Sequence, residues 1–389
     1  MGAMTTPRTI DEIRPEHIQR AAQRLLGDDG VRVTAVRAGA SEPFEYPKFG
    51  AKSFDVLEFD YESATGGGTS SMILRRRAPR DAVSTLIGDL DHRELLAFKH
   101  GLLDEMPDSF AHPYLDVIHD PAHGQYWAFL EDVTGDMQTV GIVDALPDDK
   151  IRAILAHLAA FHAHFWDRVD VLDQPWLMSL RTPVDYWYRL IVEIVDGVET
   201  RSEATQYIIS QWPWLPDGIM RLLDSLEPDT RELVIGLFRN PQRLIDEIEG
   251  MPLTLCHYDF DNRNLGLRRA EDGSWRTVVI DWEIVGVGVY GVADVGRFMT
   301  YQQPENLAEH LEFYLGELER HLGHGIDRAD WFKAYEIVTV AIWQIVGFLF
   351  AAMVSAPDAP VPDDQREGMR QRVYADVAAV EALARKWLA

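Results

Sequence analysis

The spacing of apolar residues changes once along this chain, and that change constrains the fold more than any other feature. Short runs of alternating apolar and polar residues occur at 31–37, 54–61 and 70–76. A period of two is typical of half-buried β-strands. After about residue 148 the spacing becomes helical, most clearly from Ile151 to Trp166. The sequence therefore predicts an α+β protein in which a small antiparallel β lobe precedes a larger, mainly helical lobe.

The same periodicity predicts further elements in each lobe. A helix is expected from Pro15 to Leu26, ended by Gly27, and Gly66 to Gly68 should separate the second and third strands. We place the junction near Glu131 to Asp136, so that the lobes comprise residues 1–131 and 132–389. Other expected elements are a strand at 126–130 and helices at 92–103, 183–195, 204–211, 217–226, 239–248 and much of 330–388.

Charge and composition exclude some classes of protein. The 389 residues carry a net charge of −26, which argues against a nucleic-acid partner because such a partner needs a basic face. Acidity favours solubility, and a cationic substrate is the open alternative. The uncharged stretch from Ile337 to Ala356 is as long as a membrane span, but Thr339 and Gln344 favour a buried helix. No signal-peptide pattern is present and Cys256 is the single cysteine, so we expect a cytoplasmic protein.

The stretch CHYDFDNRN, from Cys256 to Asn264, is too rich in short polar residues for a plain strand or helix. His257, Asp259 and Asn264 fit the pattern H-x-D-x-x-x-x-N. Kinase-type phosphotransferases use a related loop, in which the aspartate orients an attacking hydroxyl and the asparagine helps to hold a metal ion. Each residue also has a structural alternative, since Asp259 and Asn262 suit a turn and His257 suits a buried position.

The hairpin that follows this loop predicts a second metal ligand. Strand-like runs at 265–269 and 275–280 flank Asp272-Gly273, a strong turn signal. A turn centred between those two residues would set Asn264 directly opposite Asp281. Opposed residues have Cα atoms about 4.5–5.5 Å apart, which suits two ligands of one magnesium ion. A shift of one residue would remove this alignment.

These residues resemble the catalytic loop of the aminoglycoside phosphotransferase and choline kinase group, small-molecule kinases similar in fold to protein kinases. The segment VVIDWEIVGVGVYGVADVGRF, from Val278 to Phe298, resembles the metal motif of that group, with Asp294 as its trailing aspartate. Leu158 to Trp166 resembles the helix before the catalytic loop. The resemblance covers residues 28–355 loosely and is specific over Leu255 to Phe298. It implies a two-lobed, protein-kinase-like fold.

The resemblance also implies a nucleotide-binding role for the first lobe, residues 1–131. The family expects a lysine on the third strand, and this chain offers Arg75 there, with Glu94 as its helix partner. Arginine stays charged and binds phosphate well; the alternative is a solvated surface pair. The other implied contacts are Gly50 and Ser53 for the phosphates and the backbone of Glu131 and Val133 for adenine.

Taken together, the resemblance implies a magnesium-dependent phosphotransferase that moves the γ-phosphate of ATP or GTP to a hydroxyl of a small molecule. Asp259 is then the catalytic carboxylate, with His257, Arg263 and Asp294 in support. The implied magnesium ligands are Asn264 and Asp281. Aminoglycosides, amino alcohols, macrolides and sugars are all open as acceptors.

Substrate contacts are expected from the helical stretch 175–250, which resembles the substrate-shaping insertion of small-molecule kinases. Asp261 and Glu283 are further candidate substrate contacts; Asp261 also suits a turn. The aromatic candidates, for which core packing is the equal alternative, are Trp176, Tyr186, Trp187, Trp212 and Trp214.

A pseudokinase-type module, which binds a nucleotide or a partner without turnover, is the alternative function. It is motivated by the absence of the third-strand lysine and by the irregular phosphate-covering loop. A protein kinase is not expected, because no Asp-Phe-Gly or Ala-Pro-Glu segment marks an activation loop.

Overall fold

The chain divides into two compact units that interleave in sequence. The first comprises 1–83, 94–138 and 265–280, and the second comprises 84–93, 139–264 and 281–389. The structure, a computed structural model, describes residues 7, 9–39, 52–77, 82–89, 92–120, 125–137, 145–179, 181–182, 184–197, 201–302, 304–342, 347–361 and 363–388. The lobe boundary at 131/132 stays a prediction.

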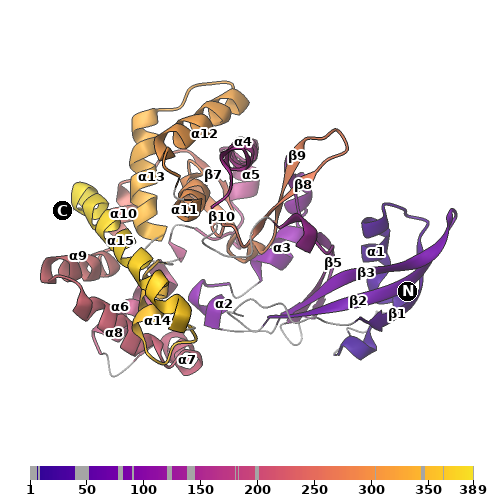
Figure 1. The fold of residues 1–389 in the computed structure, drawn as a ribbon, viewed down its shortest axis with the longest axis horizontal. Coiled ribbons are helices and arrows are strands. Elements are labelled where there is room, and N and C mark those ends of the chain that lie inside the picture. Colours follow the sequence, from indigo (N-terminus) through magenta and orange to yellow (C-terminus); the bar gives the residue numbers. More distant parts are fainter. Residues whose placement is uncertain are drawn as a thin grey trace. The chain divides into compact units, whose positions relative to one another are not determined.

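The main element of the first unit is a five-stranded antiparallel sheet (Figure 1), with strand order β1-β2-β3-β6-β5. It confirms the alternating runs as strands. Ser63 pairs with Gly66, so a two-residue turn joins β2 to β3 and the three glycines lie inside β3 instead of separating the strands. The strands are β1 (Arg32–Ala38), β2 (Lys52–Ser63), β3 (Gly66–Arg77), β5 (Tyr114–Asp120) and β6 (Gln125–Leu130).

Helix α1 (Pro15–Leu26) packs on one face of this sheet and coincides with the predicted helix. Ile18 and Ala22 are fully buried against sheet residues that include Phe59 and Phe129. Burial of apolar side chains on both partners makes this the core of the first unit.

The rest of the first unit is made of short elements. Helix α3 (Arg93–Lys99) is shorter than predicted, because Gly101 adopts a left-handed conformation after it. The hairpin strands β8 and β9 form a small sheet with β4, which is parallel to β9. The bounds are η1 (Ile10–Glu12), η2 (Leu103–Glu105), β4 (Phe110–Ala111), η3 (Thr134–Asp136), β8 (Leu265–Arg269) and β9 (Trp275–Val279); α2 spans Ala82–Leu86.

The second unit is mainly helical, with one two-stranded ribbon formed by β7 (Leu253–Cys256) and β10 (Gly286–Val289) among the described residues. The helices that were expected to begin at residues 151, 204 and 217 are confirmed as α4, α7 and α8. The elements are α4 (Asp148–His164), α5 (Val169–Leu172), η4 (Val184–Tyr188), α6 (Arg189–Val195), α7 (Glu203–Gln211), α8 (Leu215–Ser225), α9 (Pro228–Arg239), α10 (Gln242–Asp246), η5 (Trp282–Ile284), α11 (Val292–Gln302), α12 (Leu307–Leu322), α13 (Arg328–Ile342), α14 (Phe348–Ser355) and α15 (Asp363–Leu388).

One helix prediction in this unit is wrong. Arg239 was expected to begin a helix that runs to Ile248, but it ends α9, and α10 starts only after Pro241. Proline has no backbone N–H to donate, which explains why a single helix does not continue through this point.

The long uncharged stretch falls within α13 and α14, and its residues 343–346 lie outside the described part of the chain. Phe348 and Ala352 are fully buried, as expected for a core helix. In the described part of the chain, no helix combines the length and the apolar character that a membrane crossing requires.

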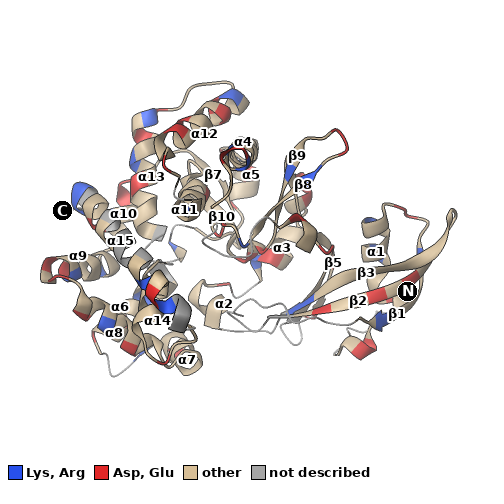
Figure 2. Cartoon of the chain, in the orientation of Figure 1, with Lys and Arg blue, Asp and Glu red and all other residues tan. Residues whose placement is uncertain are grey.

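Acidic and basic residues are interspersed over the strands and helices of both units (Figure 2). Many form exposed ion pairs, such as Arg37 with Glu58 at 2.9 Å and Arg328 with Glu312 at 2.8 Å. Pairs of this kind contribute little to folding stability, so the buried cores carry most of it.

Close packing of α8 against α14 predicts a large cost for one added methyl group. A Cβ atom at Gly218 would lie 2.3 Å from the carbonyl oxygen of Ala352, a backbone atom that cannot move aside easily. We expect G218A to lower the free energy of unfolding by about 2 kcal/mol, measured by urea denaturation.

Gly236 in α9 provides the matched control, because nothing lies within 4 Å of a Cβ atom there. G236A should leave stability unchanged or raise it by up to about 1 kcal/mol through helix propensity. Equal effects of the two substitutions would rule out the close approach of α8 and α14.

Candidate active site

The polar loop 257–264 begins directly after β7 with a fully buried histidine. The His257 ring meets the edge of Trp282 at 4.8 Å between centroids and lies 6.2 Å from Phe260. His257 is therefore packed among aromatic side chains, and its orienting role stays a prediction.

The carboxylate of Asp294 on α11 holds the start of the loop backbone. Its two oxygens accept the N–H of His257 at 2.8 Å and the N–H of Tyr258 at 2.6 Å. Tyr258 has a φ of 67°, a left-handed conformation that is costly for a side chain of this size. The two hydrogen bonds therefore stabilise a backbone shape that the chain would not adopt alone.

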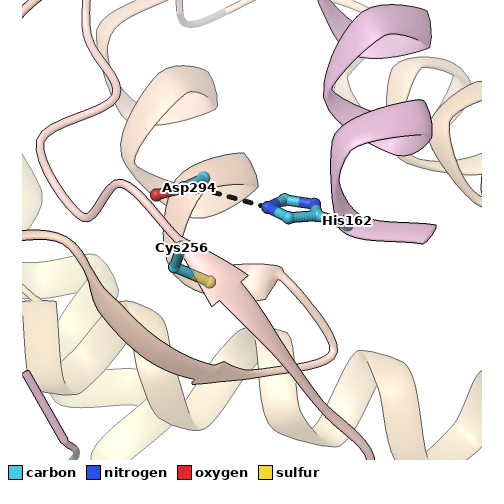
Figure 3. A group of neighbouring side chains, drawn as sticks. All are labelled: His162, Cys256 and Asp294. Carbon is cyan, nitrogen blue, oxygen red and sulfur yellow. Dashed lines mark hydrogen bonds and ion pairs between the residues drawn. The ribbon is translucent and has the colours of Figure 1, made fainter. Parts of the chain in front are cut away.

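A histidine holds this carboxylate in turn (Figure 3), and a tyrosine holds the histidine. Nε2 of His162 on α4 lies 3.2 Å from Asp294, and Nδ1 lies 2.7 Å from the hydroxyl of Tyr314 on α12. Burial, with Cys256 and Asp294 nearby, raises the pKa of Tyr314 well above its usual value, so this hydroxyl stays a donor. A carboxylate accepts and a phenol hydroxyl can donate, so these contacts fit the His162 tautomer in which Nε2–H donates to Asp294 and Nδ1 accepts from Tyr314.

His162, Cys256 and Asp294 also bring ligand-type atoms within 4.8 Å of one another. Their hydrogen bonds favour a structural role over a metal site. Both Asp294 oxygens accept backbone N–H groups and both ring nitrogens of His162 are engaged. Burial raises the pKa of the Cys256 thiol well above its usual value, whereas a metal needs the thiolate.

Asp259 lies at the exposed side of the loop beside two arginines. Arg297 on α11 donates to its Oδ1 at 2.9 Å, and Arg263 donates to the same oxygen at 3.2 Å. Burial raises the pKa of Asp259, but Arg263 and Arg297 outweigh that effect and hold the pKa at about 2. The carboxylate is therefore ionised at neutral pH and a weak base, which suits orientation of a hydroxyl better than removal of its proton.

Asp261, which is fully buried, binds the same two arginines. Its side chain has no exposed surface; Arg263 and Arg297 donate to its Oδ2 at 2.7 and 2.8 Å. Arg297 also stacks over the Tyr301 ring at 4.6 Å. Asp261 thus aligns the two guanidinium groups, which favours a structural role over the predicted contact with an amino-bearing substrate.

Hydrogen bonds fix the side-chain amide of Asn264 so that its oxygen, and not its nitrogen, is available to bind a metal ion. Its Nδ2 donates to the backbone carbonyl and to the carboxylate of Asp259, each at 2.9 Å. Two acceptors around one end of the amide define which atom is nitrogen. The oxygen therefore points away from Asp259, and an amide oxygen with a nearby carboxylate is a donor set that fits Mg²⁺.

The predicted register of the hairpin is wrong by one residue. Leu265 pairs with Val279, so the same register places Asn264 opposite Ile280 and not opposite Asp281. The cause is the turn: the N–H of Gly273 donates to the carbonyl of Ala270, and Gly273 has a φ of 82°. A three-residue loop with a left-handed glycine has replaced the expected two-residue turn.

Asp281 nevertheless lies near enough to Asp259 for its charge to raise the pKa of that carboxyl. It follows β9 and precedes η5 with a φ of 65°. This left-handed residue turns the chain away from the sheet direction, and aspartate tolerates the conformation better than most residues. Proximity to Asp259 thus arises from a local turn instead of the predicted strand pairing.

The nucleotide candidates of the first unit include one buried ion pair. Arg75 on β3 and Glu94 on α3 are 3% and 1% exposed and hydrogen-bonded, so the alternative of a solvated surface pair is wrong. Ser53 lies in β2 opposite Arg76, while Gly50 lies outside the described residues. Their contact with phosphate stays a prediction.

The predicted adenine contacts lie just after β6. The N–H of Glu131 donates to the carbonyl of Pro113 at 2.8 Å, and the carbonyl of Val133 accepts the N–H of Asp136 at 2.9 Å. Arg268 binds the side chains of both acidic residues, Glu131 at 3.0 Å and Asp136 at 2.6 Å. The proposed contacts with adenine would use the Glu131 carbonyl and the Val133 N–H.

The predicted substrate contacts differ in exposure. Glu283 is buried, at 4% exposed, and its backbone carbonyl accepts from Arg93 at 3.4 Å. Trp187 and Trp214 are buried core residues, so core packing is the better interpretation of these two rings than substrate contact. Trp176 and Trp212 are half-buried, so their contact with substrate stays a prediction.

Sequence reasoning missed three residues that support the loop: His162, Arg297 and Tyr314. Arg297 has a detectable signal, because it lies one helical turn after Asp294 in an otherwise apolar segment and so shares its face. His162 and Tyr314 come from helices distant in sequence, so their contacts with the loop could not be predicted from their own segments.

Comparison with known proteins returns similarity in structure alone. No family model and no curated protein matches the sequence. A choline/ethanolamine kinase family protein from Mesorhizobium loti is 14% identical, over 85% of this chain and 90% of that chain, with a TM-score of 0.41. A microcompartment-associated aminopropanol kinase is 16% identical, over 94% and 96%, with a TM-score of 0.43.

A third similar structure is the GDP complex of aminoglycoside 2′-phosphotransferase-IIIa, 11% identical over 96% of this chain and 99% of that chain, with a TM-score of 0.35. With TM-scores below 0.5, the similarities do not by themselves assign an activity to this chain.

The Asp294 contacts predict that D294N releases the loop. An asparagine amide offers one acceptor where two backbone donors and His162 need partners, so a buried donor loses its bond. Cys256, the single cysteine, precedes the loop and is fully buried. We expect D294N to raise the rate of Cys256 modification by Ellman's reagent at least about tenfold, since an unmet buried donor costs about 1–3 kcal/mol.

Asp327 is the control, because it also accepts two backbone N–H groups, those of Ala329 and Asp330, but at the exposed start of α13. Asparagine is an equally good residue for capping a helix, so D327N should leave the thiol rate unchanged. A D294N rate equal to the wild-type rate would show that Asp294 does not hold the loop.

Proposed function

We propose that this protein is a magnesium-dependent phosphotransferase, which moves the γ-phosphate of ATP or GTP to a hydroxyl group of a small molecule. The observation that carries the proposal is the arrangement of Asp259, Asn264 and Asp281. One ionised carboxylate and one oriented amide stand on a loop held by buried hydrogen bonds, and the carboxylate of Asp281, from the turn after β9, lies near the first.

Each of these residues has a distinct proposed role. Asp259 orients the hydroxyl of the acceptor toward the γ-phosphate, which its pKa of about 2 supports. Asn264 and Asp281 would hold magnesium, which neutralises phosphate charge when bound. Arg263 and Arg297 keep Asp259 in place and ionised.

Arg75 is proposed to contact the nucleotide phosphates, with Glu94 holding its guanidinium. Arginine is a suitable substitute for the expected lysine because it remains charged and donates in pairs to phosphate oxygens. Gly50 and Ser53 are proposed to cover the phosphates, and the backbone of Glu131 and Val133 to bind adenine.

The proposed acceptor is an alcohol that carries an amine, such as an amino alcohol or an aminoglycoside. The net charge of −26 supports a cationic substrate through the attraction of its field. Macrolides and sugars belong in the same screen, because half-buried rings such as Trp176 and Trp212 suit a bulky acceptor.

The proposed role of Asp259 predicts that a substitution there lowers turnover but leaves nucleotide binding nearly unchanged. D259N keeps the shape of the side chain but removes its charge, so kcat should fall by about 10³-fold. The Kd for ATP should change by less than about threefold, since the residue is proposed to act on the acceptor. Radiolabel transfer from [γ-³²P]ATP or GTP to an alcohol panel measures the first, and calorimetry measures the second.

D272N is the matched control, because Asp272 lies exposed in the hairpin turn and caps Ser274. It should leave both quantities unchanged. A D259N enzyme with near-normal turnover would remove Asp259 from the chemistry. Nucleotide binding by the wild-type protein without transfer to any alcohol would favour the pseudokinase-type module.

The proposed metal ligands predict a specific magnesium dependence. EDTA should abolish turnover, and added Mg²⁺ should restore it. D281N removes a charged ligand, so its half-saturating Mg²⁺ concentration should rise at least about tenfold. An unchanged Mg²⁺ titration in D281N, with D272N alongside, would contradict this assignment.

A further inference from the structure

Glu94 is the centre of a buried hydrogen-bond cluster in the first unit. Arg75 and the hydroxyl of Tyr114 donate to its Oε1, and the hydroxyl of Tyr126 donates to its Oε2. All four side chains belong to residues that are no more than 3% exposed. One carboxylate thus receives three donors from three different strands of the sheet.

The sheet register explains how two of these donors meet. Arg75 on β3 pairs with Ala128 on β6, and Arg77 pairs with Tyr126. Side chains two residues apart on a strand share a face, so Arg75 and Tyr126 project from the same face of the sheet. The opposite face carries Leu74 and Phe129, which pack in the core with α1.

Tyr114 reaches this face because of a β-bulge. The pairing of β5 with β6 shifts between Tyr114 and Asp116, which sets Tyr114 opposite Leu130. Without the extra residue, alternation would turn Tyr114 toward the α1 face, where Leu115 is buried. Bulges commonly re-aim a side chain in this way, and here the bulge delivers a donor to Glu94.

The hydroxyls of Tyr114 and Tyr126 help to stabilise the buried charges of Arg75 and Glu94. A buried ion pair is stable only when its geometry is good and its remaining hydrogen-bonding sites are filled. Arg75 alone leaves the second oxygen of Glu94 to other donors, and Tyr126 fills that position. With both tyrosines bound, the carboxylate has little freedom to rotate, and the guanidinium that it holds is fixed with it.

We propose that Tyr114 and Tyr126 are positioning residues that fix Glu94, and through it Arg75, before any nucleotide binds. The fixing of Arg75 follows from contacts within the first unit. Its benefit for phosphate binding rests on the proposed function. Two measurements on the full chain separate these statements.

The first measurement needs no nucleotide. The Nε–Hε signal of Arg75, assigned by its loss in R75K, should be rigid in the wild type by ¹⁵N heteronuclear NOE. Y114F/Y126F should lower that NOE toward values of mobile side chains, and each single variant should give a partial effect if the double variant does not fold. Y61F, on β2 beside Phe59 and away from Glu94, should match the wild type.

An Arg75 signal that is equally rigid in Y114F/Y126F would overturn the proposal. The second measurement is the Kd for Mg-ATP by calorimetry, well below the melting temperature. We expect about a tenfold increase in Y114F/Y126F, because two bonds to a charged group are lost. In an R75M background the same pair of substitutions should leave the Kd unchanged.

An equal increase in both backgrounds would show that the tyrosines do not act through Arg75, and the proposal would fall. A wild-type protein that binds neither ATP nor GTP, with an Arg75 signal loosened in Y114F/Y126F, would instead uphold the positioning role and remove the proposed function.

Discussion

The conformation of the polar loop depends on one buried carboxylate, that of Asp294. Its two bonds to the N–H groups of His257 and Tyr258 hold a left-handed tyrosine in place. From that point the chain continues to Asp259 and Asn264, whose positions relative to each other are set by direct hydrogen bonds. A site of this kind stores strain in its backbone and balances it by hydrogen bonds beneath. The helices that carry His162 and Tyr314 extend that support into the core, so the loop conformation depends on α4, α11 and α12 together.

Asp259 and Asp261 of the loop differ in exposure, and their roles differ accordingly. Asp261 is buried and aligns Arg263 and Arg297, whereas Asp259 is partly exposed and shares the same arginines. The positive charges keep Asp259 ionised and weaken it as a base. In phosphoryl transfer most of the catalysis comes from positioning and electrostatics, so a weakly basic carboxylate is sufficient for the proposed role. The polar stretch is therefore a rigid charge cluster and not merely a turn.

Local patterns predicted much of this molecule, and contacts at a distance account for what they missed. The alternating runs and α1 were predictable because burial on one face imposes a period on the sequence. The spacing of His257, Asp259 and Asn264 was sufficient to single out this stretch as a candidate site. The hairpin register was not, because a single left-handed residue, Gly273, changes the loop from two residues to three. The burial of Arg75 with Glu94, and the roles of His162 and Tyr314, depend on tertiary packing that no local pattern records.

The central claim is that the polar loop and the turn at Asp281 place Asn264 and Asp281 to bind a metal beside Asp259. Anomalous diffraction from crystals of the full chain with Mn²⁺ and a non-hydrolysable ATP analogue tests it most directly. We expect a manganese peak about 2.1 Å from the amide oxygen of Asn264 and a carboxylate oxygen of Asp281, with the γ-phosphate facing Asp259. A metal bound to neither residue, or located at His162, Cys256 and Asp294, would contradict the claim.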